Sequence, residues 1–150
     1  MAKVIGICIA AEKKGEMHIM EEVEAIAHQG LEGDRFFREN GNVEEPYFRA
    51  LTLIQSEALE ALEKEKGIQL EHWESRRNLL TRGVNLNELV DREFFVGEVL
   101  LKGFEWCEPC AYLEKRTRPG VLGGLAQRGG LRAQILQGGT IRKGDLIRVD

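Results

Sequence analysis

The chain has 150 residues, of which 43% are hydrophobic, and this is enough for one domain with a real core but not for two. Its formal net charge of −4 argues against a nucleic-acid-binding protein that relies on overall positive charge. No stretch is apolar and long enough to cross a bilayer or to act as a signal peptide, so we expect one cytoplasmic domain, residues 1–150, that does not act at a membrane.

The first half of the chain predicts short strands around one convincing helix. In chain order, strands are predicted over 4–10, 23–27 and 51–54, and a helix over 56–66. We expect the first two strands to pair with each other. Residues 27–48 form an irregular, glycine-containing stretch, and a loop of that length in a compact domain is usually functional, so we expect it to form a wall of the site. Ser56 is the expected N-cap of the helix and Gly67 its end.

The second half is dominated by strands with short turns between them. Strands are predicted over 78–81, 93–96, 99–106, 131–136 and 145–149, a short turn or helix over 84–90, and a helix over 111–116. Gly97-Glu98 should join two of these strands as a hairpin, and turns are expected at Gly138-Gly139 and Lys143-Gly144. The fold class is therefore mainly β, a barrel or curved mixed sheet with a few short helices rather than an alternating βαβ fold.

The segment Cys107-Glu108-Pro109-Cys110 lies between a predicted strand and a predicted helix. Pro109 suits the first helical turn, where its missing N–H costs nothing, so Cys110 should lie at the helix N-terminus. A thiol in that position ionises more readily, and the thiolate is the form that attacks sulfur or binds a soft metal. Cys110 is therefore the first candidate for a catalytic residue.

Other interpretations of the cysteine pair remain open at this point. A C-x-x-C segment can also be half of a zinc site, a redox pair, or two buried small residues. A tetrahedral zinc site needs a second pair of ligands, and the remaining candidates are scattered without ligand spacing. These candidates are Cys8, His18, His28 and His72.

Arginines at or beside predicted turns are the second chemical clue. They are Arg35, Arg76, Arg77, Arg128, Arg132 and Arg142. Arginine makes bidentate contacts with phosphate, and Gly129 and Gly130 would allow the backbone to approach a ligand, so the set could bind an anion. The alternative is that each is a solvated surface arginine. The glycine-rich stretches match neither a dinucleotide fingerprint nor a phosphate-binding loop of the P-loop type.

Several fragments in this order resemble a stand-alone MOSC domain, the family named for the C-terminal domain of molybdenum cofactor sulfurase. The fragments are Gly30-Leu31-Glu32-Gly33-Asp34-Arg35, Leu51-Thr52-Leu53-Ile54, Arg77-Asn78-Leu79-Leu80-Thr81-Arg82-Gly83-Val84-Asn85-Leu86, Phe95-Val96-Gly97-Glu98, Cys107-Glu108-Pro109-Cys110, Arg128-Gly129-Gly130-Leu131-Arg132-Ala133, Gly138-Gly139-Thr140-Ile141 and Lys143-Gly144-Asp145. The resemblance runs from about Gly30 to Val149. Each fragment is weak evidence, but their order and spacing together are specific.

The resemblance implies a barrel-like domain that handles the molybdenum cofactor (molybdopterin) through the cysteine after the proline, here Cys110. Four polar positions of the family, Arg77, Asn78, Arg128 and Arg132, are expected to line the pterin and phosphate pocket, with Asp34 and Arg35 near its mouth. Cys107 would be a resolving thiol, a supporting partner or a passenger. The family pattern commonly continues G-D-x-H, but Phe36 stands at the histidine position here, and this weakens any mechanism that needs that imidazole.

Two mechanisms follow from the resemblance. In one, the Cys110 thiolate holds molybdenum and the protein reduces N-hydroxylated or S-oxide small molecules with electrons from a partner protein. In the other, Cys110 carries sulfur as a persulfide received from a cysteine desulfurase, and the pyridoxal phosphate belongs to that partner. The rival from another class is a non-enzymatic anion-binding or protein-binding module with structural cysteines.

Overall fold

The computed structural model describes residues 1–39 and 46–150, so part of the expected 27–48 loop, including Gly41, lies outside the described residues. In chain order the elements are β1 (Lys3–Ile9), β2 (His18–Met20), β3 (Glu22–Ile26), β4 (Gly30–Leu31), β5 (Leu51–Gln55), α1 (Ser56–Lys66), α2 (His72–Ser75), β6 (Leu79–Arg82), a 3-10 turn η1 (Leu86–Leu89), β7 (Glu93–Val96), β8 (Val99–Trp106), α3 (Ala111–Arg116), α4 (Val121–Gly124), β9 (Leu131–Gln137), β10 (Gly139–Arg142) and β11 (Ile147–Val149). The mainly β class is confirmed.

Eight strands form one mixed sheet in the order β11-β7-β8-β9-β5-β6-β1-β2, and β10-β3-β4 form a second sheet. Only β5 and β6 run parallel within the named pairs, and α1 and α2 connect them. The large sheet is curved, so that β1, next to the β2 edge, approaches the opposite edge at β11. Lys3 of β1 forms a bridge with Leu146, which lies just before β11. Among the described strands this contact is an isolated bridge, so the barrel-like sheet is not fully closed.

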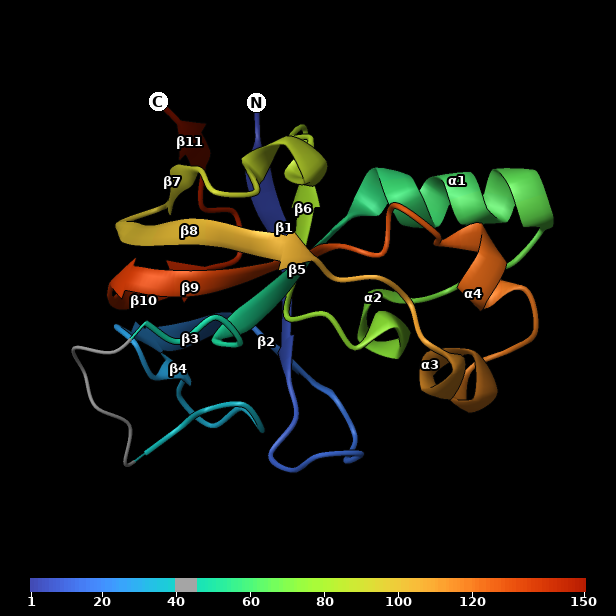
Figure 1. Cartoon of the computed structure of the whole chain (residues 1–150), viewed down its shortest axis with the longest axis horizontal. Coiled ribbons are helices and arrows are strands. Elements are labelled where there is room, and N and C mark those ends of the chain that lie inside the picture. Colours follow the sequence, from blue (N-terminus) through green and yellow to red (C-terminus); the bar gives the residue numbers. More distant parts are fainter. Residues whose placement is uncertain (40–45) are drawn as a thin grey trace.

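The apolar interior has two parts. The larger cluster fills the curved sheet, with Phe94, Leu101 and Leu131 among its fully buried side chains. The smaller cluster joins Ile54 of β5 to the helices and includes Leu62 of α1 and Leu113 of α3. Figure 1 shows α1, α3 and α4 together on one side of the strands. Within the described part of the chain, no helix is long and apolar enough to cross a membrane.

Helix α1 begins and ends for different reasons. Gly67 ends it with a left-handed φ of 68°, as expected from the absence of a Cβ. The expected cap at Ser56 is wrong, because Gln55 occupies the N-cap position and makes no side-chain capping bond. Ser56 is already helical, and its hydroxyl instead accepts a hydrogen bond from Arg82 of β6.

The predicted hairpin is confirmed, with Val96 opposite Val99 and a positive φ of 58° at Gly97. The predicted pairing of the first two strands is wrong. Strand β1 pairs with β2 and β6, whereas β3 pairs with β10 and β4. Only a turn was predicted at Gly138-Gly139, where β10 begins, and β2, β4, α2 and α4 were not predicted. These elements have four residues or fewer, too few to show a period.

Candidate functional site

Cys110 lies between the end of β8 and the start of α3. It is the N-cap residue of α3, its side chain is exposed, and it is a free thiol. Pro109 therefore precedes the helix rather than occupying its first turn, which corrects the expectation. The extended backbone of Cys110 lets its carbonyl accept the hydrogen bond from Glu114 N that closes the first turn. The thiol is thus held at a fixed junction and is open to solvent.

Cys110 opens into a pocket of about 340 Å³. The pocket is lined by Lys13, Lys14, Arg35, Phe36, Arg49, Arg76, Arg77, Cys110, Tyr112 and Leu113. Six of these side chains are cationic, and none of the described lining residues is acidic. They come from loops far apart in the sequence, so the overall net charge of −4 conceals a strongly positive concave surface.

Arg35 forms part of this surface but is already engaged. Its Nη1 donates to Asp34 Oδ1 at 2.9 Å, and its Nη2 donates to the carbonyl of Arg76 at 2.8 Å. The guanidinium also covers the Phe36 ring at 4.5 Å. Arg35 therefore fixes the pocket wall, and the aromatic ring stands where the family pattern would have an imidazole.

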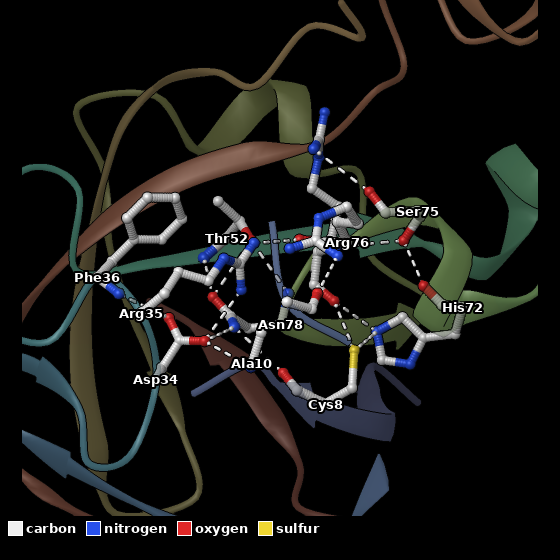
Figure 2. A network of polar contacts seen from close by, with 12 residues as sticks. Cys8, Ala10, Asp34, Arg35, Phe36, Thr52, His72, Ser75, Arg76 and Asn78 are labelled. Carbon is white, nitrogen blue, oxygen red and sulfur yellow. Dashed lines mark hydrogen bonds and ion pairs between the residues drawn. The ribbon is translucent and has the colours of Figure 1, made fainter. Parts of the chain in front are cut away.

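Asp34 and Asn78 belong to a buried polar network next to Arg35 (Figure 2). Asp34 Oδ1 accepts from Ala10 N at 3.1 Å and from Asn78 Nδ2 at 3.3 Å. The same amide of Asn78 donates to the carbonyl of Cys8, and its oxygen accepts from Thr52 N at 3.0 Å. Both residues make internal hydrogen bonds, and these tie β1, β5 and the start of β6 to the Asp34 loop.

The side chains of Arg76 and Arg77 contact different segments of the chain. Arg76 has a left-handed φ of 62°, and its Nη1 donates to the carbonyl of Gly15 at 2.7 Å. Burial, together with the nearby charges of Arg35 and Arg116, lowers the pKa of Arg76. Arg77 instead extends under the Cys107–Cys110 segment, and burial lowers its pKa as well.

The two arginines expected from the glycine-rich region separate in the structure. Arg128 donates to Glu65 Oε2 and to the carbonyl of Gly124, both at 2.9 Å, and does not line the pocket. Arg132 pairs with Glu105 at 3.5 Å, and its positive charge lowers the pKa of Arg77. In the part of the chain that the structure describes, buried Nη1 of Arg132 has no hydrogen-bond partner. An unused donor of this kind favours an acceptor from a ligand.

Cys107 differs from Cys110 because its side chain is only 4% exposed. Its backbone N–H donates to the carbonyl of Gly130 at 2.7 Å. The described residues contain no group of three or more His, Cys, Asp or Glu side chains that could hold a metal ion, so the zinc alternative gains no support. His28 has a φ of 60° and does not line the pocket, so it does not stand in for the missing histidine.

Part of this site was not predicted from the sequence. Lys13, Lys14, Arg49 and Tyr112 line the pocket, but only the basic Lys13-Lys14 turn carried a local signal. A larger hollow of about 530 Å³ adjoins the site through Arg76, which lines both. That hollow contains Glu16 and Glu74 but no thiol. The smaller pocket therefore holds the candidate chemistry.

Solved structures with a similar fold include three from bacilli and Escherichia coli. The YuaD protein from Bacillus subtilis has a TM-score of 0.82 at 16% identity, covering 99% of this chain and 96% of its own. YiiM from Geobacillus stearothermophilus has a TM-score of 0.76 at 16% identity, with coverages of 100% and 75%. YiiM from Escherichia coli has a TM-score of 0.67 at 17% identity, with coverages of 100% and 70%. At these identities the likeness establishes the fold alone.

No curated protein sequence matches the chain significantly. The MOSC domain family matches residues 27–148, a range that contains most of the pocket lining and both cysteines of the loop. Because this match spans most of the chain and the fold agrees with it, the chain belongs to the MOSC domain family.

Proposed function

We propose that the protein binds the molybdenum cofactor, with the Cys110 thiolate as a metal ligand and the exposed cations Lys13, Lys14 and Arg49 as partners of the cofactor's phosphate. The observation that carries the proposal is an exposed thiol in a pocket whose described lining residues include six cationic and no acidic side chains. Phosphate and a soft metal are the two chemical groups that these side chains suit. The MOSC domain family is linked to this cofactor, which adds independent support.

The residues present fit the cofactor's needs. The described residues offer one exposed thiol, Cys110, and no cluster that would hold a metal alone, so the other soft ligands would have to come from the cofactor's own sulfur atoms. Lys13, Lys14 and Arg49 are exposed cations of the pocket lining that can meet an anion. Arg132 does not line this pocket, but among the described residues its buried Nη1 has no hydrogen-bond partner. When bound, the cofactor supplies a redox-active metal that side chains of a protein cannot replace.

Within that site the chain's own residues would bind and orient the cofactor. Lys13, Lys14 and Arg49 attract the anion, while Arg35 and Arg76 keep the wall in place through their mutual contact. Reduction of an N-hydroxylated or S-oxide small molecule would need electrons from a partner protein, because the chain has no dinucleotide-binding fingerprint of its own. This reductase role is the finer form of the proposal.

Sulfur transfer is the second candidate, and the exposure of Cys110 favours it. In this reaction the Cys110 thiolate attacks the outer sulfur of a desulfurase persulfide. The partner's S–S bond breaks, the partner leaves as a thiolate, and Cys110 becomes the persulfide. Pyridoxal phosphate would act in the desulfurase only. A thiol that meets another protein must be reachable, and Cys110 is.

The proposal is tested with protein made in a host that synthesises the cofactor. Molybdenum, zinc and oxidised pterin are measured in the wild type, in Cys110→Ser and in Cys107→Ser. We expect molybdenum and pterin in the wild type, loss of molybdenum from Cys110→Ser, and retention in Cys107→Ser. A persulfide on Cys110 without metal would favour sulfur transfer. Stoichiometric zinc, or no metal, pterin or persulfide in any sample, would contradict both candidates and favour a plain binding module.

A further inference from the structure

The guanidinium of Arg77 is used to hold the cysteine loop, residues 107–110. Its Nε donates to the carbonyl of Gly129 at 2.8 Å, and its Nη2 donates to the carbonyls of Cys107 and Glu108 at 2.9 and 3.2 Å. Its Nη1 makes a longer contact of 3.4 Å with the carbonyl of Ser75. Four contacts therefore join the end of α2, the cysteine loop and the glycine-rich segment through one planar group.

The backbone of Arg77 is fixed from the opposite side. Its carbonyl accepts hydrogen bonds from Nε2 of His72 at 2.8 Å and from the thiol of Cys8 at 3.1 Å. Just before it, Arg76 ends α2 in the left-handed conformation, which turns the chain so that the two arginine side chains diverge. The backbone of Arg77 is thus held by Cys8 of β1 and His72 of α2, which lie outside the cysteine loop.

The cysteine loop also packs tightly against Gly129. A Cβ placed on Gly129 would lie 2.6 Å from the carbonyl oxygen of Cys107 and 2.7 Å from Cδ of Pro109. No side chain fits there without moving the loop. Arg77 therefore donates hydrogen bonds to both of the segments that meet in this close contact, through the carbonyls of Gly129 and Cys107.

We propose that Arg77 is a positioning residue for Cys110, holding residues 107–110 in the one arrangement that buries Cys107 and presents Cys110. This inference rests on the proposed function for its purpose, but its contacts need no cofactor. Arginine is required because its planar fork offers donors in several fixed directions, whereas a lysine ammonium is a compact charge on a flexible stem. With most of its donors used, Arg77 supports the pocket from behind instead of serving as a main anion ligand.

The three cysteines supply a built-in test, because Cys110 is exposed, Cys107 is buried in the loop and Cys8 is buried in the sheet. Iodoacetamide labelling of the folded protein, read out by peptide mass spectrometry, gives a rate for each thiol. We expect Arg77→Met and Arg77→Lys each to speed labelling of Cys107 by about tenfold or more, while the Cys8 rate stays within about twofold. Gly129→Ala should produce the same selective exposure of Cys107 by steric displacement.

Arg128→Met is the matched control, because Arg128 also bonds a carbonyl of the glycine-rich segment but does not touch the loop. It should leave Cys107 protected. Equal acceleration of Cys8 and Cys107 in the Arg77 variants would mean general unfolding and would overturn the inference. Full protection of Cys107 in Arg77→Lys would overturn it too, because charge alone would then suffice. Neither outcome depends on whether the protein binds the molybdenum cofactor.

Discussion

The thiol of Cys8 lies 3.6 Å from Nε2 of His72, and the two side chains face each other (Figure 2). This pair does not form a thiolate and imidazolium. Burial raises the pKa of Cys8 to about 12 and lowers the pKa of His72 to about 4. Both groups are therefore neutral donors at neutral pH, and both donate to the carbonyl of Arg77.

The neutral state of His72 predicts a pH dependence of stability. The folded pKa of about 4 lies below the ordinary value of 6.5, so between these values the unfolded chain binds a proton that the folded protein excludes. As pH falls from 6.5 to 4, the free energy of unfolding should therefore fall, by up to about 1.4 kcal/mol per pH unit from this residue. Urea unfolding at several pH values measures the slope.

The variant His72→Gln should flatten that slope, and His18→Gln is the control because His18 is exposed on β2. The difference in slope between wild type and variant gives the contribution of His72 separately from that of the carboxylates, which titrate in the same pH range. An unchanged slope in His72→Gln between pH 4 and 6.5 would show that His72 is not held neutral in the fold.

The amide of Asn78 should be a large contributor to stability. Asn78→Ala removes the acceptor for Thr52 N and the donor to Asp34 and to the Cys8 carbonyl, so these three buried groups each lose a hydrogen-bond partner. We expect a loss of about 2–4 kcal/mol in the free energy of unfolding. Chemical denaturation measures it.

A surface change on the same sheet serves as comparison. Arg82→Lys alters an exposed pair with Glu60 and should cost less than about 1 kcal/mol. If Asn78→Ala is no more costly than this, the buried network does not hold the three strands together.

The cationic pocket predicts salt-sensitive and charge-sensitive binding of an anionic cofactor. Lys13 and Lys14 are exposed lining residues, so Lys13→Glu and Lys14→Glu should each weaken cofactor retention by about threefold to tenfold without unfolding the protein. Pterin content after dialysis at low and high salt measures the effect.

Matched reversals on α1, Lys64→Glu and Lys66→Glu, change the net charge equally but lie outside the pocket lining. They should leave retention unchanged. Equal losses from both pairs of variants would show that overall charge, rather than the pocket, governs binding.

Local patterns predicted much of the fold. Gly67 and Gly97 mark a helix end and a hairpin because their positive φ angles need no tertiary partner. The pairing of β1 with β6 and of β3 with β10 could not be predicted in this way, since a strand's own residues do not identify a partner far along the chain.

The same limit applies to the site. Cys110 carried a local signal, because a thiol before a helical run is visible in the sequence. Whether an arginine meets a ligand or a protein carbonyl depends on what the fold brings beside it. Arg128 meets Glu65, Arg77 meets the cysteine loop, and Arg132 keeps a donor that has no partner among the described residues. One residue type in one kind of segment thus has three different roles.

X-ray absorption at the molybdenum edge tests the central claim most directly, on cofactor-loaded wild-type protein and Cys110→Ser. If Cys110 holds the metal, the wild type should have one more sulfur neighbour around molybdenum than the variant, which has either oxygen in that place or no metal. The Cys107→Ser protein should match the wild type, because that thiol is buried. An identical sulfur shell in wild type and Cys110→Ser would contradict thiolate ligation by Cys110.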